Sequence, residues 1–178
     1  MIKEINIDNI KDVYKPSQSF RVIGRLSLSL QDGKWTSSEE LYNEPYEKIY
    51  TDKDEESEEN YAEYIENPDK TVFLYYGNQE CVGRVRIRRN WNRYAFIEDI
   101  AVAESGRGKG IGSALIEKAI EWAKQKELYG LMLETQDVNL LACRFYRKTG
   151  FEIGAVDTML YSNFDCKDEK AIFWYLRF

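Results

Sequence analysis

The chain has 178 residues, of which 43% are hydrophobic and 31% are charged, and its formal net charge is −6. This length and composition predict one globular domain over residues 1–178 rather than a disordered chain. The acidic balance disfavours nucleic-acid binding and favours a cationic small molecule as substrate. No apolar run approaches the length of a membrane span, and the N-terminal segment lacks the hydrophobic core of a signal peptide.

The sequence contains no histidine. Catalysis by a Ser-His-Asp or Cys-His arrangement, a zinc site of the HExxH type and any histidine base are therefore excluded. The three cysteines, Cys81, Cys143 and Cys166, are odd in number and scattered, which disfavours a disulfide framework and a cysteine-based zinc site. We expect a cytoplasmic protein without a metal, whose chemistry uses carboxylates, tyrosine, lysine, cysteine or backbone groups.

The first fifty residues predict short elements. Residues 2–7 alternate imperfectly, and Asp8 is a candidate cap for a short helix that reaches toward Pro16. The segment 20–30 turns to period two, and Asp32-Gly33 after it predicts a hairpin turn. Two possible capping boxes, Thr36-x-x-Glu39 and Ser37-x-x-Glu40, then indicate a short helix that ends before Pro45.

Six of the eight residues from Asp52 to Glu59 are acidic. The run is either a solvated surface segment or an electrostatic attraction for a polycationic substrate. Tyr61, Tyr64 and Ile65 follow at helical spacing, and Asn67-Pro68 is expected to stop that helix.

The middle of the chain predicts an antiparallel meander. Strands are expected over 71–76, 81–88 and 94–103, with turns over 77–80 and 90–93 between them. The second strand places Arg84, Arg86 and Arg88 on one face and Cys81, Gly83, Val85 and Ile87 on the other.

A glycine-rich loop, Arg107-Gly108-Lys109-Gly110-Ile111-Gly112, joins the last of these strands to an amphipathic helix over 111–126. Backbone N–H groups at a helix N-terminus are unpaired, and the helix dipole favours an anion there. Glycines let a ligand approach the backbone, and the two basic side chains add positive charge. The loop is either a phosphate or diphosphate site or a plain turn before a helix.

The remaining elements complete a sheet. A short strand over 131–133 follows the helix, so strand, helix and strand predict a right-handed crossover with one parallel pair. Asn139 is expected to cap a helix through Lys148 that Gly150 ends, and strands are expected over 151–155, 158–164 and 171–178. The fold class is therefore mixed α/β, with a central, mostly antiparallel sheet flanked by helices.

The glycine loop and a second motif, Asn139-x-x-Ala142-x-x-Phe145-Tyr146-x-Lys148-x-Gly150-Phe151, resemble the GNAT superfamily of N-acetyltransferases. Within it, the segments 90–95, 97–102, 130–137 and 173–178 resemble the streptothricin acetyltransferases, and the similarity runs along nearly the whole chain. The resemblance implies direct transfer of acetyl from acetyl-CoA to a primary amine, here on the β-lysine part of streptothricin. The strands around 98–102 and 131–134 would splay apart to admit pantetheine.

The resemblance also implies site residues. The cofactor-binding set would comprise Ile100, Ala101, Val102, Arg107, Gly108, Lys109, Gly110, Ile111, Gly112, Ser113, Asn139 and Tyr146. An N–H near 100–102 would stabilise the oxyanion, and the Tyr146 phenol would protonate the departing thiolate. The alternative for Tyr146 is a core aromatic beside Phe145. Asn139 would cap its helix, contact pantetheine, or do both.

For the amine, Glu98 matches the position that acts as a base through water in related polyamine acetyltransferases. Asp99 is adjacent and expected on the opposite strand face, and Glu134 is a third candidate. Any of these acids could instead only bind ammonium groups, and the substrate-binding set would be Tyr94, Glu98, Asp99, Glu134 and Asp137. The alternatives to a streptothricin acetyltransferase are a polyamine, aminoglycoside or protein-amine acetyltransferase, or a non-catalytic acetyl-CoA-binding module. A homodimer is expected from the superfamily only.

Overall fold

The computed structural model describes residues 1–16, 19–49 and 58–178, which form two compact units. The first unit comprises 1–16, 58–131 and 177–178, and the second comprises 19–49 and 132–176. Residues 52–57 of the acidic run lie outside the described residues. Among the described helices, none is long and apolar enough to cross a membrane.

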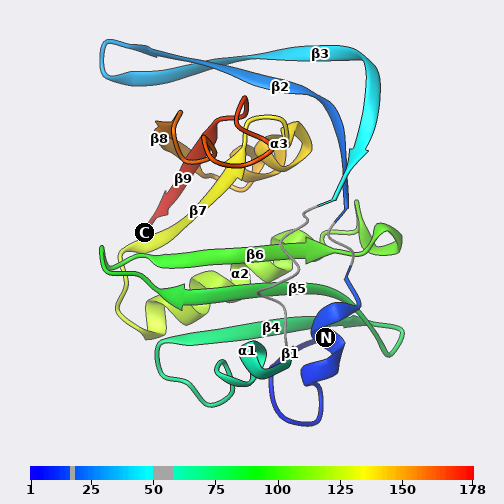
Figure 1. Cartoon of the computed structure of the whole chain (residues 1–178). Helices are drawn as coiled ribbons and strands as arrows, with labels where there is room; N and C mark the ends of the chain where they lie inside the picture. Colours follow the sequence, from blue (N-terminus) through cyan, green and yellow to red (C-terminus); the bar gives the residue numbers. More distant parts are fainter. Residues whose placement is uncertain (17–18, 50–57) are drawn as a thin grey trace. The chain divides into compact units, whose positions relative to one another are not determined.

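The first unit contains an antiparallel sheet (Figure 1). Its strands lie in the order β1 (Ile2–Glu4), β4 (Lys70–Gly77), β5 (Glu80–Arg89) and β6 (Ala95–Val102). The predicted meander is confirmed. Val85 and Ile87, both fully buried, lie on the face opposite the arginines. The predicted face of Cys81 was wrong: a bulge at Val82 turns it to the arginine face, where it packs with Val72 and Leu74, the partners of Arg86 and Arg84.

Helix α2 (Ile111–Gln125) packs against β4, β5 and β6. The predicted apolar face of this helix is buried at Ile111, Leu115, Ala119 and Trp122. The contact is close at Gly83 of β5, where an added Cβ would lie 2.9 Å from Cγ2 of Ile111 and 3.2 Å from Cδ1 of Leu115. A glycine in this strand therefore sets the distance between helix and sheet.

Three short helices complete the described part of the first unit: η1 (Ile10–Tyr14), α1 (Glu58–Ala62) and η3 (Glu104–Gly106). The prediction that Asp8 caps the first of these was wrong, because its N-cap is Asn9. The turn before it is held instead by Asn6, whose Oδ1 accepts hydrogen bonds from the N–H groups of Asp8 and Asn9. Helix α1 ends at Ala62, earlier than the predicted stop at Asn67-Pro68.

In the second unit, β2 (Phe20–Gln31) and β3 (Lys34–Lys48) form a long antiparallel hairpin (Figure 1). The predicted turn is confirmed, with φ of 49° at Asp32 and 74° at Gly33. The predicted helix after Thr36 was wrong. Thr36 pairs with Ser29 across the hairpin and its Oγ1 donates to the Ser29 carbonyl, so strand pairing with β2 replaces the helix.

The other elements of the second unit are β7 (Gly130–Gln136), which begins at the end of the first unit, α3 (Leu140–Lys148), β8 (Glu152–Asp157) and β9 (Ala171–Arg177). Strands β8 and β9 pair antiparallel. The strand predicted over 158–164 was wrong, because Oδ1 of Asp157 accepts the N–H groups of Met159 and Leu160 and folds the chain into turns. Both strands of the predicted parallel pair are formed, as β6 and β7, and the mixed α/β class is confirmed.

Candidate active site

Strand β6 carries two adjacent carboxylates at a β-bulge. In the pairing with β5, Asp99 lies opposite Arg86 and Ile97 opposite Ile87, so Glu98 is an extra residue in β6. A bulge of this kind interrupts the alternation of side chains. Glu98 and Asp99 therefore both contact arginines from one face of β5, which corrects the expectation that they point to opposite faces.

Glu98 is surrounded by donors. Its Oε1 accepts a hydrogen bond from Nε of Arg88 at 3.0 Å, and its Oε2 accepts one from the Tyr64 hydroxyl at 2.6 Å. Nε of Arg86 lies 3.8 Å from the same Oε2. Burial, together with the hydrogen bond to the carboxylate, strongly raises the pKa of Tyr64. These contacts fix the orientation of the Glu98 carboxylate.

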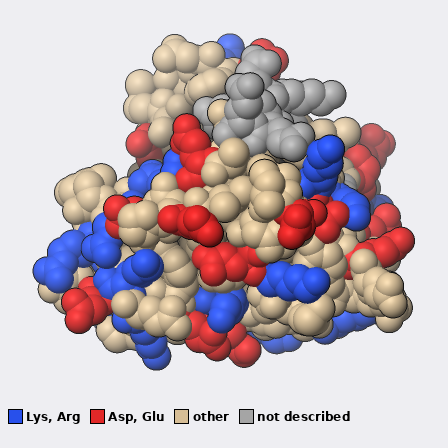
Figure 2. Space-filling view, turned by 90° about the horizontal axis from the view of Figure 1, so that it is seen from below, with Lys and Arg blue, Asp and Glu red and all other residues tan. Residues whose placement is uncertain are grey.

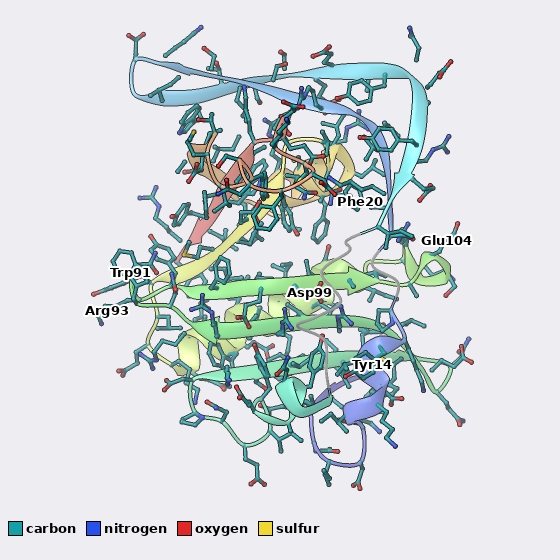
Figure 3. All side chains as sticks on the ribbon, viewed as in Figure 1. Tyr14, Phe20, Trp91, Arg93, Asp99 and Glu104 are labelled. Atoms are coloured by element: carbon teal, nitrogen blue, oxygen red, sulfur yellow. The ribbon has the colours of Figure 1, made fainter. Side chains whose placement is uncertain are left out.

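Asp99 has a buried partner. Its Oδ2 lies 2.5 Å from Nε of Arg84, whose side chain is 1% exposed, and Nη1 of Arg84 donates to the carbonyl of Val13. Figure 3 shows Asp99 on the ribbon of β6 and Glu104 in the segment that follows the strand. The pair therefore balances a buried charge within the first unit.

The remaining predicted β6 residues, Ile100, Ala101 and Val102, pair with Val85, Arg84 and Gly83 of β5. Ala101 is buried, and its two neighbours are partly buried. Tyr94 lies just before the strand, partly buried, and its N–H donates to Oδ1 of Asn92 in the preceding turn.

The glycine loop follows β6 and η3. Gly108 and Gly110 have φ of 75° and 79°, a region that favours glycine, and no atom lies within 4 Å of an added Cβ at either position. Arg107 and Lys109 are exposed beside them, and Nε of Arg107 donates to the carbonyl of Val102 at 3.2 Å. The loop thus leaves open space next to two cations.

The N-terminus of α2 is not capped by a side chain. Its N-cap residue is Gly110, and no acidic residue lies in the first turn. The first backbone hydrogen bond of the helix runs from Ala114 N to Gly110 O at 3.0 Å. The N–H groups of Ile111, Gly112 and Ser113 precede it and lack acceptors within the helix. An uncapped helix start behind an open, basic glycine loop fits a diphosphate such as that of coenzyme A.

The second unit carries Tyr146 on α3. Its side chain is 5% exposed and packs against Phe145, Phe151 and Trp174, with ring centroids 5.4, 5.6 and 6.1 Å away. The ring of Tyr146 therefore belongs to the aromatic core of the second unit.

Three further predicted residues lie on β7 and after it. Oδ1 of Asn139 accepts from Ala142 N at 3.3 Å, which confirms the predicted cap of α3. Asp137 is 1% exposed, lies 3.1 Å from Nη2 of Arg25 and accepts from Lys170 N, contacts that hold the unit together. Glu134 accepts a hydrogen bond from the Tyr161 hydroxyl.

The structure thus brings Glu98 and Asp99 into one charged cluster and gathers the loop residues at the start of α2. Sequence reasoning did not identify Tyr64 and Arg84 as partners of the two acids. The period-two arginines of β5 were the available signal, since alternation placed them on one face. Figure 2 shows acidic and basic side chains interspersed over the face in view.

The model of the acetyltransferase (GNAT) family matches residues 35–151, more than half of the chain. The chain belongs to the GNAT acetyltransferase family. The predicted enzyme class, an acetyl-CoA-dependent N-acetyltransferase, is confirmed by this membership. Among the described residues, no group of three or more cysteines and acidic residues could hold a metal ion.

The chain is similar along its whole length to streptothricin acetyltransferase A of Bacillus subtilis, with 52% identity over 178 residues and 100% of both chains. It is 37% identical over 132 residues to a streptothricin acetyltransferase of Escherichia coli, covering 74% of this chain and 70% of the relative. A Bacillus anthracis protein described as a streptothricin acetyltransferase, solved in complex with acetyl coenzyme A, has a TM-score of 0.91 and 36% identity, covering 100% of this chain and 99% of the other.

Proposed function

We propose that this protein transfers acetyl from acetyl-CoA to a primary amine on the β-lysine part of streptothricin and thereby confers resistance to that antibiotic. The observation that carries the proposal is the 52% identity to streptothricin acetyltransferase A over the full length of both chains. Acetylation would remove one positive charge and part of the hydrogen-bonding capacity of the drug.

The donor side of the reaction depends on the first unit. The N–H groups of Gly108 and of Gly110 to Ser113, with the side chains of Arg107 and Lys109, would hold the diphosphate of acetyl-CoA. When bound, acetyl-CoA supplies the acetyl thioester. A backbone N–H of the segment 100–102 would stabilise the negative charge that develops on the carbonyl oxygen. Asn139 would contact pantetheine in addition to capping α3.

The amine must lose a proton before it attacks, because a lysine-like amine is protonated at neutral pH. In this account Glu98 accepts that proton, through water, while Arg88 and Tyr64 hold its carboxylate in place. Asp99 instead neutralises the buried Arg84. Tyr94, Asp99, Glu134 and Asp137 stay candidates for binding the substrate, although Asp137 is already paired with Arg25.

Tyr146 would act as the general acid. Its ring is held on three sides by Phe145, Phe151 and Trp174, so the hydroxyl has a fixed position. That hydroxyl would give its proton to the departing sulfur.

We also propose, as further parts of this account, a cytoplasmic enzyme that acts without nucleic acid and forms a homodimer. Cys81 and Cys143 are buried free thiols, as a reducing compartment would allow. The dimer rests on the superfamily resemblance alone and is tested by light scattering.

The direct experiment measures thiol release from acetyl-CoA with streptothricin, spermidine, an aminoglycoside and a peptide with a free N-terminus offered in parallel. We expect kcat/KM to be highest for streptothricin by about 100-fold or more, since specificity is a ratio of such constants. A higher kcat/KM for spermidine, the aminoglycoside or the peptide would show that the substrate belongs to that class and not to the streptothricins. Binding of acetyl-CoA without turnover of any amine would favour a non-catalytic module.

A further inference from the structure

Strand β7 presents two different faces within the second unit. Thr135 uses one face, where its Oγ1 accepts a hydrogen bond from Nε1 of Trp174 at 3.1 Å and contacts Sγ of Cys143 at 3.7 Å. Alternation places Glu134 and Gln136 on the opposite face, with their Cα atoms about 6.6 Å apart. These two side chains are therefore neighbours that take no part in the packing of Thr135.

Gln136 holds a hydrogen-bond acceptor without a donor. The residue is 8% exposed, and its Oε1 is buried with no hydrogen-bond partner in the described part of the chain. Buried polar atoms in folded proteins are nearly always paired, because burial removes the water that would otherwise satisfy them. The unpaired buried oxygen of Gln136 is therefore available to a donor from outside the described residues.

Glu134 holds a negative charge without a cation. Its carboxylate accepts a hydrogen bond from the neutral hydroxyl of Tyr161, and no ion pair within the described residues includes it. Burial raises the pKa of its carboxyl, and the Tyr161 hydrogen bond offsets that rise only in part. Glu98, Asp99 and Asp137 all differ from it, because each lies beside an arginine.

We infer that Glu134 and Gln136 bind the second, non-reacting ammonium group of a diamine substrate. An ammonium has three N–H donors and no acceptor, which complements two adjacent acceptors, one of them charged. The inference rests on the proposed function and deepens it. The amine that attacks must be neutral, whereas this second amine stays protonated, so the site selects substrates with two amines over those with one.

The test is calorimetric binding with coenzyme A at saturation and no acetyl transfer. The probe is the amide of β-lysine, 3,6-diaminohexanamide, compared with its two analogues that lack either amine. We expect wild type to bind the diamine about 10-fold more tightly than either analogue. Gln136→Leu should bind the diamine about 10-fold more weakly than wild type does. It should bind one of the two analogues, the one that lacks the non-reacting amine, with the same affinity as wild type.

Gln136→Glu keeps an acceptor and should bind the diamine at least as tightly as wild type. The exposed Gln125→Leu is the matched control and should bind like wild type. Equal affinity of wild type and Gln136→Leu for the diamine, or no preference of wild type for the diamine, would overturn the inference. Because binding is measured without turnover, a wild type that prefers the diamine but fails to acetylate streptothricin would refute the proposed function alone.

Thermal unfolding separates this role from a structural one. Gln136→Leu should leave Tm unchanged or higher, whereas a loss of Tm would show that its amide has a partner within the protein and would count against the inference. For Glu134→Gln the sign follows from the raised pKa: a carboxyl whose pKa is raised by folding destabilises the native state once pH exceeds its ordinary value of about 4.5. Glu134→Gln should therefore raise Tm at pH 8 and change it little at pH 4.

Glu117→Gln, at an exposed residue, is the control for this pH comparison. Its effect on Tm should be the same at pH 8 and at pH 4. A lower Tm of Glu134→Gln at pH 8 would mean that a cation of the protein already pairs with Glu134, which would overturn the inference.

Discussion

Asp99 and Arg84 form an ion pair at 2.5 Å in which the arginine side chain is 1% exposed. Arg84 also donates to the backbone of Val13, so this one guanidinium links β6, β5 and η1 of the first unit. Removing one partner of a buried pair leaves the other charge without compensation. The carboxylate of Asp99 therefore stabilises the fold by balancing a buried charge. Glu98 does so to a lesser degree, because its partner Arg88 is more exposed.

Asp99→Asn should lower the free energy of unfolding by about 3 kcal/mol, because the amide still accepts a hydrogen bond but does not balance the buried charge. Chemical denaturation measures this loss. The matched control is Asp69→Asn, whose partner Arg89 is 43% exposed, and the expected loss there is below about 1 kcal/mol. Equal losses in the two variants would contradict the structural role of Asp99.

Glu98→Gln should reduce kcat more at about pH 6.5 than at about pH 9, because at low pH almost all of a lysine-like amine is protonated and needs a base. Glutamine keeps the size, and its single amide oxygen still accepts from one of the two donors, Arg88 or Tyr64, but it cannot take up the proton. Full pH–rate profiles of wild type and this variant provide the measurement. Parallel profiles, or a raised KM with kcat intact, would make Glu98 a binding residue only.

Gly110→Asp should weaken coenzyme A binding on the order of 100-fold, because a carboxylate at the N-cap would itself accept from the free N–H groups of α2 and repel the diphosphate. Calorimetry measures the affinity. Gly33→Asp is a matched control at the hairpin turn, with a similar φ of 74° and equally open space. Its affinity for coenzyme A should equal that of wild type, and an unchanged affinity in Gly110→Asp would exclude the loop from the site.

Tyr146→Phe should lower kcat by roughly 10- to 1000-fold while the affinity for coenzyme A and Tm change little, since the packed ring is retained and only the hydroxyl is lost. Steady-state kinetics and thermal unfolding give both quantities. Tyr129→Phe, at a residue 53% exposed, controls for the loss of a phenol elsewhere. Wild-type turnover in Tyr146→Phe would leave this tyrosine as a packing residue.

Periodic and strictly local signals predicted the fold well. The spacing of Ile111, Leu115, Ala119 and Trp122 gave α2, and Asp32-Gly33 gave the hairpin turn, because each depends on residues close in sequence. The capping boxes after Thr36 failed for the opposite reason. A helix start competes there with pairing to β2, and that partner strand is not visible in a local pattern.

The site was predicted in its residue types more than in its contacts. The loop 107–112 was found because glycines, cations and a helix start coincide in a short segment. The bulge at Glu98 was not found, because period two carries no mark of an extra residue. The unpaired oxygen of Gln136 also escaped prediction, since an amide shows its lack of a partner only when the surrounding residues are in place.

The measurement that tests the account most directly is the structure of the product formed from streptothricin and acetyl-CoA. We predict that tandem mass spectrometry finds a single acetyl group on an amine of the β-lysine part, with one thiol released for each acetyl transferred. Acetylation elsewhere on the molecule, or release of thiol without any acetylated streptothricin, would contradict the account.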